Sequence, residues 1–304
     1  MARHRGVILY LAMLALASGS FVAIASWQGQ TVNAVAGLYM FTPALAAVVA
    51  RLGADRPPFG DAGLRIGRWG DLGRAWLLGV AGAAVSVVVF LVAGAVSLDL
   101  SGQGFLDVIE RFAPGQGRAM VEQLPAGWTL REMLLAFTLG GLTVFNVPSI
   151  LLGFGEEFGW RGYLFPRLWR IRPWLAIVGG GLLWFGWHVP LVLLMPGAAP
   201  GVGELVLRVV AGGIGCIAMG VVFAHAYAAS GSIWVPSLLH IAFNNASRSF
   251  SYWITVENQP LGDALLALVV IAWAAWLWRT GGLDALRRFG PPTAEVAPSR
   301  EHRE

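Results

Sequence analysis

The sequence predicts an all-α polytopic membrane protein with about eight transmembrane helices. Of its 304 residues, 57% are hydrophobic and only 12% are charged, whereas a soluble domain usually carries about 25% charged residues. The mean hydropathy is +0.66. Apolar segments long enough to cross a bilayer alternate with polar connections along the chain, and this alternation defines the class.

The predicted helices correspond to the apolar segments. These lie near residues 7–26, 31–50, 75–97, 133–168, 174–195, 205–229, 233–250 and 261–278. A hydrocarbon core of about 30 Å requires about 20 residues, and the segments approach or exceed this length. The first segment follows Arg3 and Arg5, and Ala23-Ile24-Ala25 has the small-x-small pattern of a signal-peptide cleavage site. We favour an uncleaved first helix, with a cleaved signal peptide as the alternative.

The arginines predict how these helices are oriented. All 21 basic residues are arginine, and most lie in the connections 51–74 and 161–172 and in the tail after 278. The intervening short connections contain none. Basic loops favour the cytoplasmic side of a membrane. We therefore expect both termini in the cytoplasm, and a bacterial inner membrane as the location.

This pattern divides the chain into four parts. Residues 1–132 hold the N-terminal helices and one long connection, 98–132, which we expect in the periplasm as a solvated, partly helical loop, with a lid as the alternative. Residues 133–255 form a helical core that carries the candidate site. Residues 256–280 form the last transmembrane helix. Residues 281–304 are polar and charged, and we expect this tail to be flexible.

The composition excludes several kinds of function. The single cysteine, Cys216, rules out an internal disulfide and a cysteine-rich metal site. The sequence has no phosphate-binding glycine loop and no nucleic-acid motif, so we expect no nucleic-acid partner. The 40 glycines are spread through the apolar segments, which is typical of helices that pack closely in a membrane.

The stretch from Gly153 to Gly162 places two adjacent carboxylates and an arginine in an apolar segment. A charge at this depth costs at least about 2.5–3.5 kcal/mol, so membrane proteins keep such residues for pairing, for wet cavities or for chemistry. Glu157 and Arg161 are four residues apart, with the acid first, which favours an ion pair on a helix. Glu156 is rotated by about 100° and faces elsewhere, so we predict that Glu156 carries the chemistry.

Two histidines interrupt other apolar segments. His188 is the only ionisable residue of its segment and precedes Pro190, which should kink the helix because it donates no backbone hydrogen bond. His240 and Asn244 are four residues apart and share one helix face. We interpret His225 as an interfacial residue near a helix end. Taken singly, each histidine is also compatible with a buried structural role.

Taken together, Glu156, His188, His240 and Asn244 come from three predicted helices and predict a buried polar cavity. A buried carboxylate can accept a proton from a water molecule, and imidazole and amide donors can stabilise an oxyanion. The same ligand types suit zinc, which Glu156, His188 and His240 would bind with an open position for water. Both arrangements predict the attack of water on a carbonyl group.

The candidate residues fall into three motifs. These are Glu156-Glu157-x-x-x-Arg161, Phe185-x-x-His188 and His240-x-x-x-Asn244. They resemble the signature of the CPBP family, which contains type II CAAX prenyl endopeptidases and bacteriocin-processing or self-immunity proteins (also called the Abi family). The resemblance covers about residues 135–255 and implies an intramembrane endopeptidase. Within it, Glu156 is the general base; the other residues complete the catalytic site (His188, His240, Asn244) or support it (Glu157, Arg161).

The resemblance implies a membrane-embedded or lipidated peptide as substrate, in contact with membrane lipids. Metal-dependent and metal-free mechanisms have both been considered for the family. We favour a metal-free, glutamate-activated water, because the chain has no His-Glu-x-x-His zinc motif; Zn²⁺ is the alternative cofactor. Two other functions stay open. One is a non-catalytic immunity or partner-binding protein of the same fold. The other is a proton-coupled transporter, which the absence of matching broken helices in two halves disfavours.

Overall fold

The computed structural model describes residues 2–27, 37–55, 58–143, 146–193 and 201–290. Helices make up most of it. In the first half they are α1 (Ala2–Trp27), α3 (Thr42–Ala54), α4 (Trp69–Val92), α5 (Gln103–Phe112), α6 (Gln116–Glu122) and α7 (Leu130–Leu142). In the second half they are α8 (Val147–Gly159), the π-helical turn η1 (Trp160–Leu164), α9 (Phe165–Ile171), the π-helical turn η2 (Leu175–Gly179), α10 (Gly180–Leu193), α11 (Val202–Ser230), α12 (Trp234–Ser251), α13 (Gln259–Arg279) and the 3-10 helix η3 (Gly282–Phe289).

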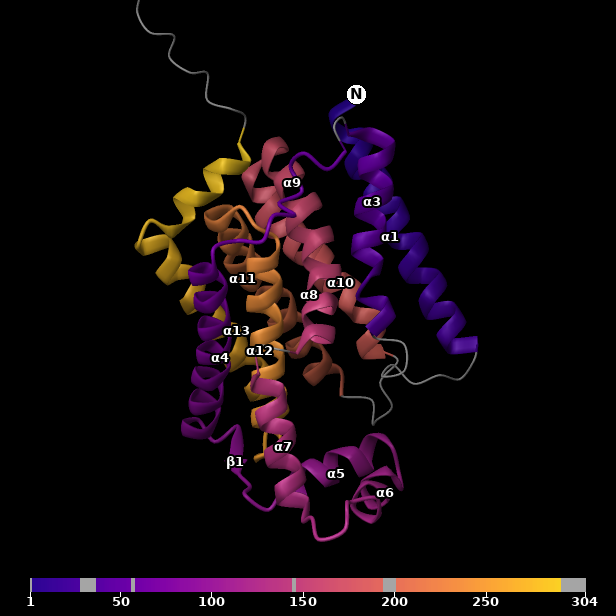
Figure 1. The fold of residues 1–304 in the computed structure, drawn as a ribbon, viewed down its shortest axis with the longest axis vertical. Coiled ribbons are helices and arrows are strands. Elements are labelled where there is room, and N and C mark those ends of the chain that lie inside the picture. Colours follow the sequence, from indigo (N-terminus) through magenta and orange to yellow (C-terminus); the bar gives the residue numbers. More distant parts are fainter. Residues whose placement is uncertain (1, 28–36, 56–57, 144–145, 194–200, 291–304) are drawn as a thin grey trace, which may run out of the picture.

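The long helices pack into one bundle with α8 and α10 in its middle (Figure 1). In this view α1 and α3 lie on one side of these central helices, and α4, α11, α12 and α13 lie on the other. The strongest packing pairs are α12 with α4, α11 with α13, and α1 with α3. Helix α8 contacts both α3 and α12 and thus joins the two sides. The predicted all-α polytopic fold is confirmed.

The predicted number of eight membrane passes is not confirmed. Among the described residues, five helices are long and apolar enough to cross a membrane, and they correspond to α1, α3, α4, α11 and α13. A sixth pass results if α7 is combined with the helices that follow it, across a bend of 49°. The segment 133–168 was predicted as one pass, but α8 starts anew at Asn146. The Asn146 side chain caps it by accepting a hydrogen bond from the Ser149 backbone at 3.3 Å.

Helices α10 and α12 are the other two predicted passes. Helix α10 is apolar but short, and Pro190 lies inside it without ending it. Helix α12 is too polar to qualify as a lipid-facing span, and it packs against α4, α8, α7 and α11. Because protein surrounds most of α12, its polar residues need not face hydrocarbon. The two helices that carry the predicted histidines are therefore the least lipid-like of the bundle.

Two glycines allow α8 to approach α3 at backbone distance. Gly155 and Gly159 are one turn apart on α8. A Cβ atom on Gly155 would lie 2.8 Å from the Met40 carbonyl oxygen, and one on Gly159 would lie 2.5 Å from that of Pro43. This small-xxx-small pattern is the usual way for membrane helices to pack closely without a large hydrophobic driving force. It places the end of α8 against the start of α3.

The two ends of the bundle differ in structure. At the lower end in Figure 1, helices α5 and α6 are part of the connection 98–132. The prediction that this connection is partly helical is therefore confirmed. There β1 (Val96–Leu98) pairs antiparallel with β2 (Ile254–Val256). At the other end lie the start of α1, the loop before α4, helix α9 and η3. We call this the arginine-rich end, because the connections 51–74 and 161–172 both lie there.

The prediction of a flexible tail from residue 281 onward is wrong for its first part. Residues Gly282–Phe289 form η3, in which Leu286 and Phe289 are buried. His225, which was expected to be interfacial, donates from Nδ1 to the Gly282 carbonyl at 2.6 Å and fastens η3 to α11. Apolar residues at a helical spacing thus give this polar stretch a buried face. The rest of the tail, 291–304, lies outside the described residues.

The contact between α8 and α3 gives the first prediction. Replacing Gly159 by Ala adds a methyl group where the Pro43 backbone lies, so we expect a loss of about 1–3 kcal/mol in stability through overpacking. Thermal unfolding in detergent measures it. Gly215→Ala on α11 is the matched control, because nothing lies within 4 Å of its added methyl; there we expect no loss. Equal melting temperatures for the two variants would contradict the close contact.

Candidate active site

The site begins with two adjacent glutamates in the last turn of α8. Both are buried: Glu156 is 2% exposed and Glu157 is 0% exposed. The helix turns by about 100° between neighbours, so the two carboxylates point to different partners, as predicted. A carboxylate buried in a membrane helix needs hydrogen bonds or a counter-charge. The partners of each glutamate therefore indicate what it does.

Glu157 is held by two cationic or potentially cationic groups. Its Oε1 accepts a hydrogen bond from Nη1 of Arg161 at 3.0 Å, which confirms the predicted ion pair. The same oxygen accepts from Nδ1 of His240 at 2.8 Å. This second contact joins α8 to α12 and was not predicted, since we expected His240 to face Glu156. Its other oxygen, Oε2, is buried and has no partner among the described residues.

Glu156 has a different, electrically neutral partner. Its Oε2 accepts a hydrogen bond from the indole Nε1 of Trp184 on α10 at 3.0 Å. The Trp184 ring also meets both imidazoles edge-on, with ring centres 5.4 Å from His188 and 5.8 Å from His240. One tryptophan thus lies between the glutamate and the two histidines. The structure brings Glu156, His188 and His240 together around Trp184.

Aromatic rings complete the surroundings of the charged groups. The guanidinium of Arg161 lies over the rings of Trp184 at 4.1 Å and of Phe223 at 5.0 Å. Phe223, on α11, also stacks on His240 with ring centres 4.8 Å apart. A desolvated cation over an aromatic ring gains about 2 kcal/mol. Cation–π contacts and the ion pair with Glu157 therefore both hold Arg161 in this position.

His188 is oriented by its own helix. Its Nδ1 lies 2.9 Å from the carbonyl oxygen of Trp184, one turn earlier. A carbonyl only accepts, so Nδ1 carries the hydrogen in the neutral ring and Nε2 is left as an acceptor. His188 is half-buried. The hydrogen bond therefore assigns its tautomer and leaves one nitrogen for a ligand.

The neighbour of His188, Trp187, is fastened to the N-terminal helices. Its indole Nε1 donates to Ser18 and to Thr42, each at 3.1 Å, and its carbonyl accepts from the hydroxyl of Tyr39 at 2.8 Å. The Tyr39 and Trp187 rings stack with centres 4.7 Å apart. Because Trp187 and His188 share a backbone, α1 and α3 contribute to the placement of the histidine.

Two predicted features fit less closely. Asn244 lies one turn beyond His240 on α12 and is exposed, and no hydrogen bond joins it to the other site residues described. Phe185, from the second motif, packs on α11: a Cβ atom on Gly212 would lie 2.6 Å from its ring. Trp184, and not Phe185, contacts the glutamate. Trp184 and His188 are four positions apart on the helix, so both lie on one face.

The predicted zinc ligands are not arranged as a metal site. Within the described ranges, no group of three or more His, Cys, Asp or Glu side chains is placed to hold a metal ion. Glu156 directs one oxygen to Trp184, and His240 directs Nδ1 to Glu157. These contacts turn the groups toward other partners. The residues in this arrangement do not fit Zn²⁺, and we derive no step through a metal.

These features define a class of site. A buried carboxylate and two oriented imidazoles come from three helices of one membrane bundle, and such groups can hold and activate a water molecule. Residues 124–246 match the model of a protein family described as type II CAAX prenyl endopeptidase, Rce1-like. The match spans all three motifs. Over this segment, 123 of the 304 residues, the chain is similar to that family.

The family supports a CAAX-type intramembrane protease activity for this integral membrane protein. None of the curated proteins compared matches the chain. Helices α1, α3 and α4 precede the matched segment, and α13 follows it. The contacts of Ser18, Tyr39 and Thr42 with Trp187 therefore lie partly outside the segment that carries the resemblance.

Sequence reasoning missed Trp184 and Phe223 as parts of the site. A signal existed for Trp184, since a tryptophan in a membrane helix needs an acceptor for its N–H, and this one lies a turn before His188. Phe223 had none, because an aromatic residue on an apolar helix is usually core. Only the packing of α11 against α10 and α12 brings Phe223 to His240.

Trp184 gives the second prediction. Trp184→Phe keeps an aromatic ring under Arg161 but removes the N–H that holds Glu156. We expect kcat for cleavage of a quenched, farnesylated CAAX peptide to fall about tenfold, the scale of about 1.4 kcal/mol for a lost hydrogen bond to a charged group. KM should change little. Trp174→Phe, at an exposed tryptophan, is the control and should keep wild-type kinetics. An unchanged kcat in Trp184→Phe would show that this hydrogen bond is not needed.

Proposed function

We propose that the protein is an intramembrane endopeptidase that hydrolyses peptide bonds of membrane-associated substrates with a glutamate-activated water. The observation that carries this proposal is the different pairing of the two adjacent glutamates. Glu157 is committed to Arg161 and His240, whereas Glu156 accepts from a neutral indole. The division of roles between two chemically identical residues follows from these partners.

Glu156 is suited to be the general base. A charged partner would oppose protonation of its carboxylate, but its partner Trp184 is neutral. A buried base whose hydrogen-bond partner is neutral can take a proton from water and later return it. Glu157, by contrast, is the counter-ion of a buried arginine, and protonating it would leave Arg161 uncompensated.

The two histidines support different parts of the reaction. With Nδ1–H donated to the Trp184 carbonyl, Nε2 of His188 accepts a hydrogen bond from the attacking water. With Nδ1–H donated to the Glu157 carboxylate, His240 carries a second hydrogen on Nε2 when it is an imidazolium, and Glu157 then supplies the counter-charge. That Nε2–H, with the exposed amide of Asn244, is the donor for the developing oxyanion.

The proposed reaction balances with these groups alone. The water oxygen attacks the scissile carbonyl carbon, and Glu156 takes one of its protons. The carbonyl oxygen becomes the oxyanion that His240 and Asn244 stabilise. The C–N bond then breaks and Glu156 returns its proton to the leaving amine, which gives a carboxylic acid and an amine. The second hydrogen of the water passes from the acid to the amine, so the final products are a carboxylate and an ammonium. Peptide hydrolysis by this route needs no redox partner.

The substrates and the location extend this proposal. We place the arginine-rich end in the cytoplasm of a bacterial inner membrane, because the arginines of the connections 51–74 and 161–172 lie there. The start of α1 and η3 are at the same end, which supports cytoplasmic termini. The burial of Glu156 among the helices of the bundle favours peptides that reach into the bilayer, either membrane-embedded leader segments or lipidated CAAX-like C-termini.

The assignment of the base gives the third prediction. Glu156→Gln keeps the shape of the side chain but cannot accept the proton, so we expect kcat to fall by at least about a hundredfold with KM nearly unchanged. Glu157→Gln removes the counter-charge of Arg161 and should cost about 3–5 kcal/mol in stability as well as activity. Peptide cleavage and thermal unfolding in detergent separate the two effects.

The outcome distinguishes the alternatives. Cleavage by Glu156→Gln at the wild-type rate would sink the proposal. If Glu157→Gln instead abolished cleavage in a stably folded protein while Glu156→Gln was benign, the two assignments would be reversed. A cellular phenotype that Glu156→Ala and His240→Ala still complement would favour the non-catalytic partner-binding function.

Metal dependence gives the fourth prediction. We propose a metal-free mechanism, because the site residues make hydrogen bonds to one another and the chain lacks a compact zinc motif. We expect full activity after dialysis against EDTA and no stoichiometric zinc in elemental analysis of the purified protein. Loss of activity in EDTA with recovery on adding Zn²⁺ would instead assign Glu156, His188 and His240 as ligands.

A further inference from the structure

Arg51, at the end of α3, is a fully buried arginine far from the motifs in sequence. It lies outside the segment that matches the family. Its Nη2 donates to the carbonyl oxygen of Gly162 at 2.5 Å, across 111 residues of chain. Its Nη1 donates to Asp61 at 2.5 Å and to the Pro58 carbonyl at 3.0 Å. A buried guanidinium with this many specific partners is a device for holding backbone in place.

The Gly162 carbonyl needs an outside donor for a reason that lies in the sequence. In an α-helix it would accept from the backbone N–H four residues later, but that residue is Pro166, which has none. The chain forms the π-helical turn η1 at this point, over Trp160–Leu164. π-Helical turns are found mostly at functional sites. Arg51 supplies a charged donor to a carbonyl inside this turn.

Gly162 directly follows Arg161, so the position of η1 decides where the Arg161 side chain lies. From there Arg161 contacts Glu157 through an ion pair and Trp184 through its ring. Glu157 in turn holds His240, and Trp184 holds Glu156. A shift of η1 would therefore change the positions of the hydrogen-bond partners of both glutamates.

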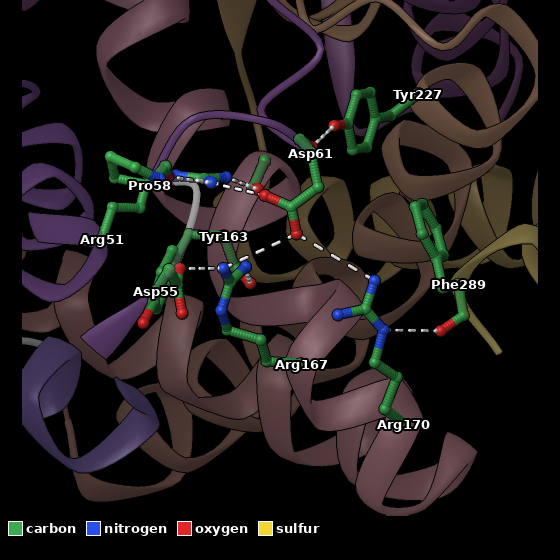
Figure 2. A network of polar contacts seen from close by, with 10 residues as sticks. Arg51, Asp55, Pro58, Asp61, Tyr163, Arg167, Arg170, Tyr227 and Phe289 are labelled. Atoms are coloured by element: carbon green, nitrogen blue, oxygen red, sulfur yellow. Dashed lines mark hydrogen bonds and ion pairs between the residues drawn. The ribbon is translucent and has the colours of Figure 1, made fainter. Parts of the chain in front are cut away.

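A second set of charges holds Arg51 from the other side, at the arginine-rich end (Figure 2). The Asp61 carboxylate lies between Arg51, Arg167 and Arg170, at 2.5, 3.6 and 4.0 Å. Burial alone would raise the pKa of Asp61, but these three arginines lower it below its ordinary value. Asp61 therefore stays ionised as the counter-ion of Arg51. The Tyr227 hydroxyl also binds the Asp61 backbone carbonyl, at 2.8 Å.

We propose that Arg51 is a positioning residue of the active site, which holds the π-helical turn through the Gly162 carbonyl and thereby sets Arg161 against Glu157 and Trp184. The proposal deepens the endopeptidase function and rests on it for its kinetic readout. It also gives α3, which lies outside the matched segment, a role: through Arg51, α3 holds the helical segment that carries Glu157 and Arg161.

Arg51→Met removes the donor while keeping much of the side-chain volume. We expect kcat for the quenched farnesylated peptide to fall at least about tenfold with KM changed less than about threefold, since a misplacement of about 1 Å can cost about a hundredfold. Arg51→Lys keeps the charge but not the fork that reaches both Gly162 and Asp61, so it should lie between Arg51→Met and wild type. Arg65→Met, at an exposed arginine of the following loop, is the control and should leave kcat unchanged.

The decisive variant is the pair Arg51→Met with Pro166→Ala. The Pro166→Ala substitution supplies the missing backbone N–H within the helix, so the Gly162 carbonyl no longer depends on Arg51. We therefore expect the pair to recover several-fold in kcat over Arg51→Met alone. Because a change from proline to alanine can also stabilise a helix in general, thermal unfolding of Pro166→Ala alone separates the two effects. Kinetics are compared at equal amounts of monodisperse protein from size-exclusion chromatography.

Hydrogen exchange gives a readout that does not need activity. We expect the backbone amides of 156–168 to exchange faster in Arg51→Met and Arg51→Lys than in wild type or Arg65→Met, and slower again in the double variant. If wild type cleaves neither the farnesylated peptide nor a panel of membrane-embedded leader peptides, the endopeptidase proposal fails and the exchange data still decide the positioning. If wild type cleaves and both kcat and exchange are unaffected in Arg51→Met, or the double variant shows no recovery, the positioning role is overturned.

Discussion

The double engagement of the Glu157 carboxylate is the interaction on which the rest of the site depends. One oxygen accepts from Arg161 on the turn after α8 and from His240 on α12. Both donors come from residues whose charge would be costly alone in a membrane bundle. Pairing them with one carboxylate makes the cluster tolerable, and it ties the glutamate motif to the histidine motif in a single hydrogen-bonded unit. Removing any member leaves a buried polar group without its partner.

Because of that arrangement, Glu156 has no cationic hydrogen-bond partner within the part of the chain that the structure describes. Because Glu157 compensates the arginine, the neighbouring carboxylate needs only the indole of Trp184. The same tryptophan ring contacts Arg161 and both imidazoles, so it packs against the ion pair as well as against Glu156. The N-terminal helices then brace the unit at two points. Trp187 is held by Ser18, Tyr39 and Thr42, and the Gly162 carbonyl by Arg51. Both contacts come from helices that lie before the family match.

Sequence alone was a good guide wherever helix periodicity and hydrophobicity are sufficient. The all-α membrane class follows from composition, and the ion pair between Glu157 and Arg161 follows from a spacing of four. Helix periodicity and hydrophobicity failed where contacts between distant parts of the chain determine the local structure. The break before α8 depends on the cap at Asn146, and the buried face of η3 depends on packing against α9 and α11. The hydrogen bond between His240 and Glu157 was not predicted, because the rotation of α12 relative to α8 is not encoded in the spacing of either motif.

The sequence by itself determined which residues are too polar for their surroundings: Glu156, Glu157, His188 and His240. The reason is that solvation energy depends on residue type and depth, and both can be read along the chain. Only the tertiary structure decided how these residues pair, since hydrogen bonds between helices depend on the relative rotation and height of those helices. It also brought in Trp184, Phe223 and Arg51. Their side chains are ordinary in sequence and become significant only through the glutamate, the histidine and the carbonyl oxygen that they meet.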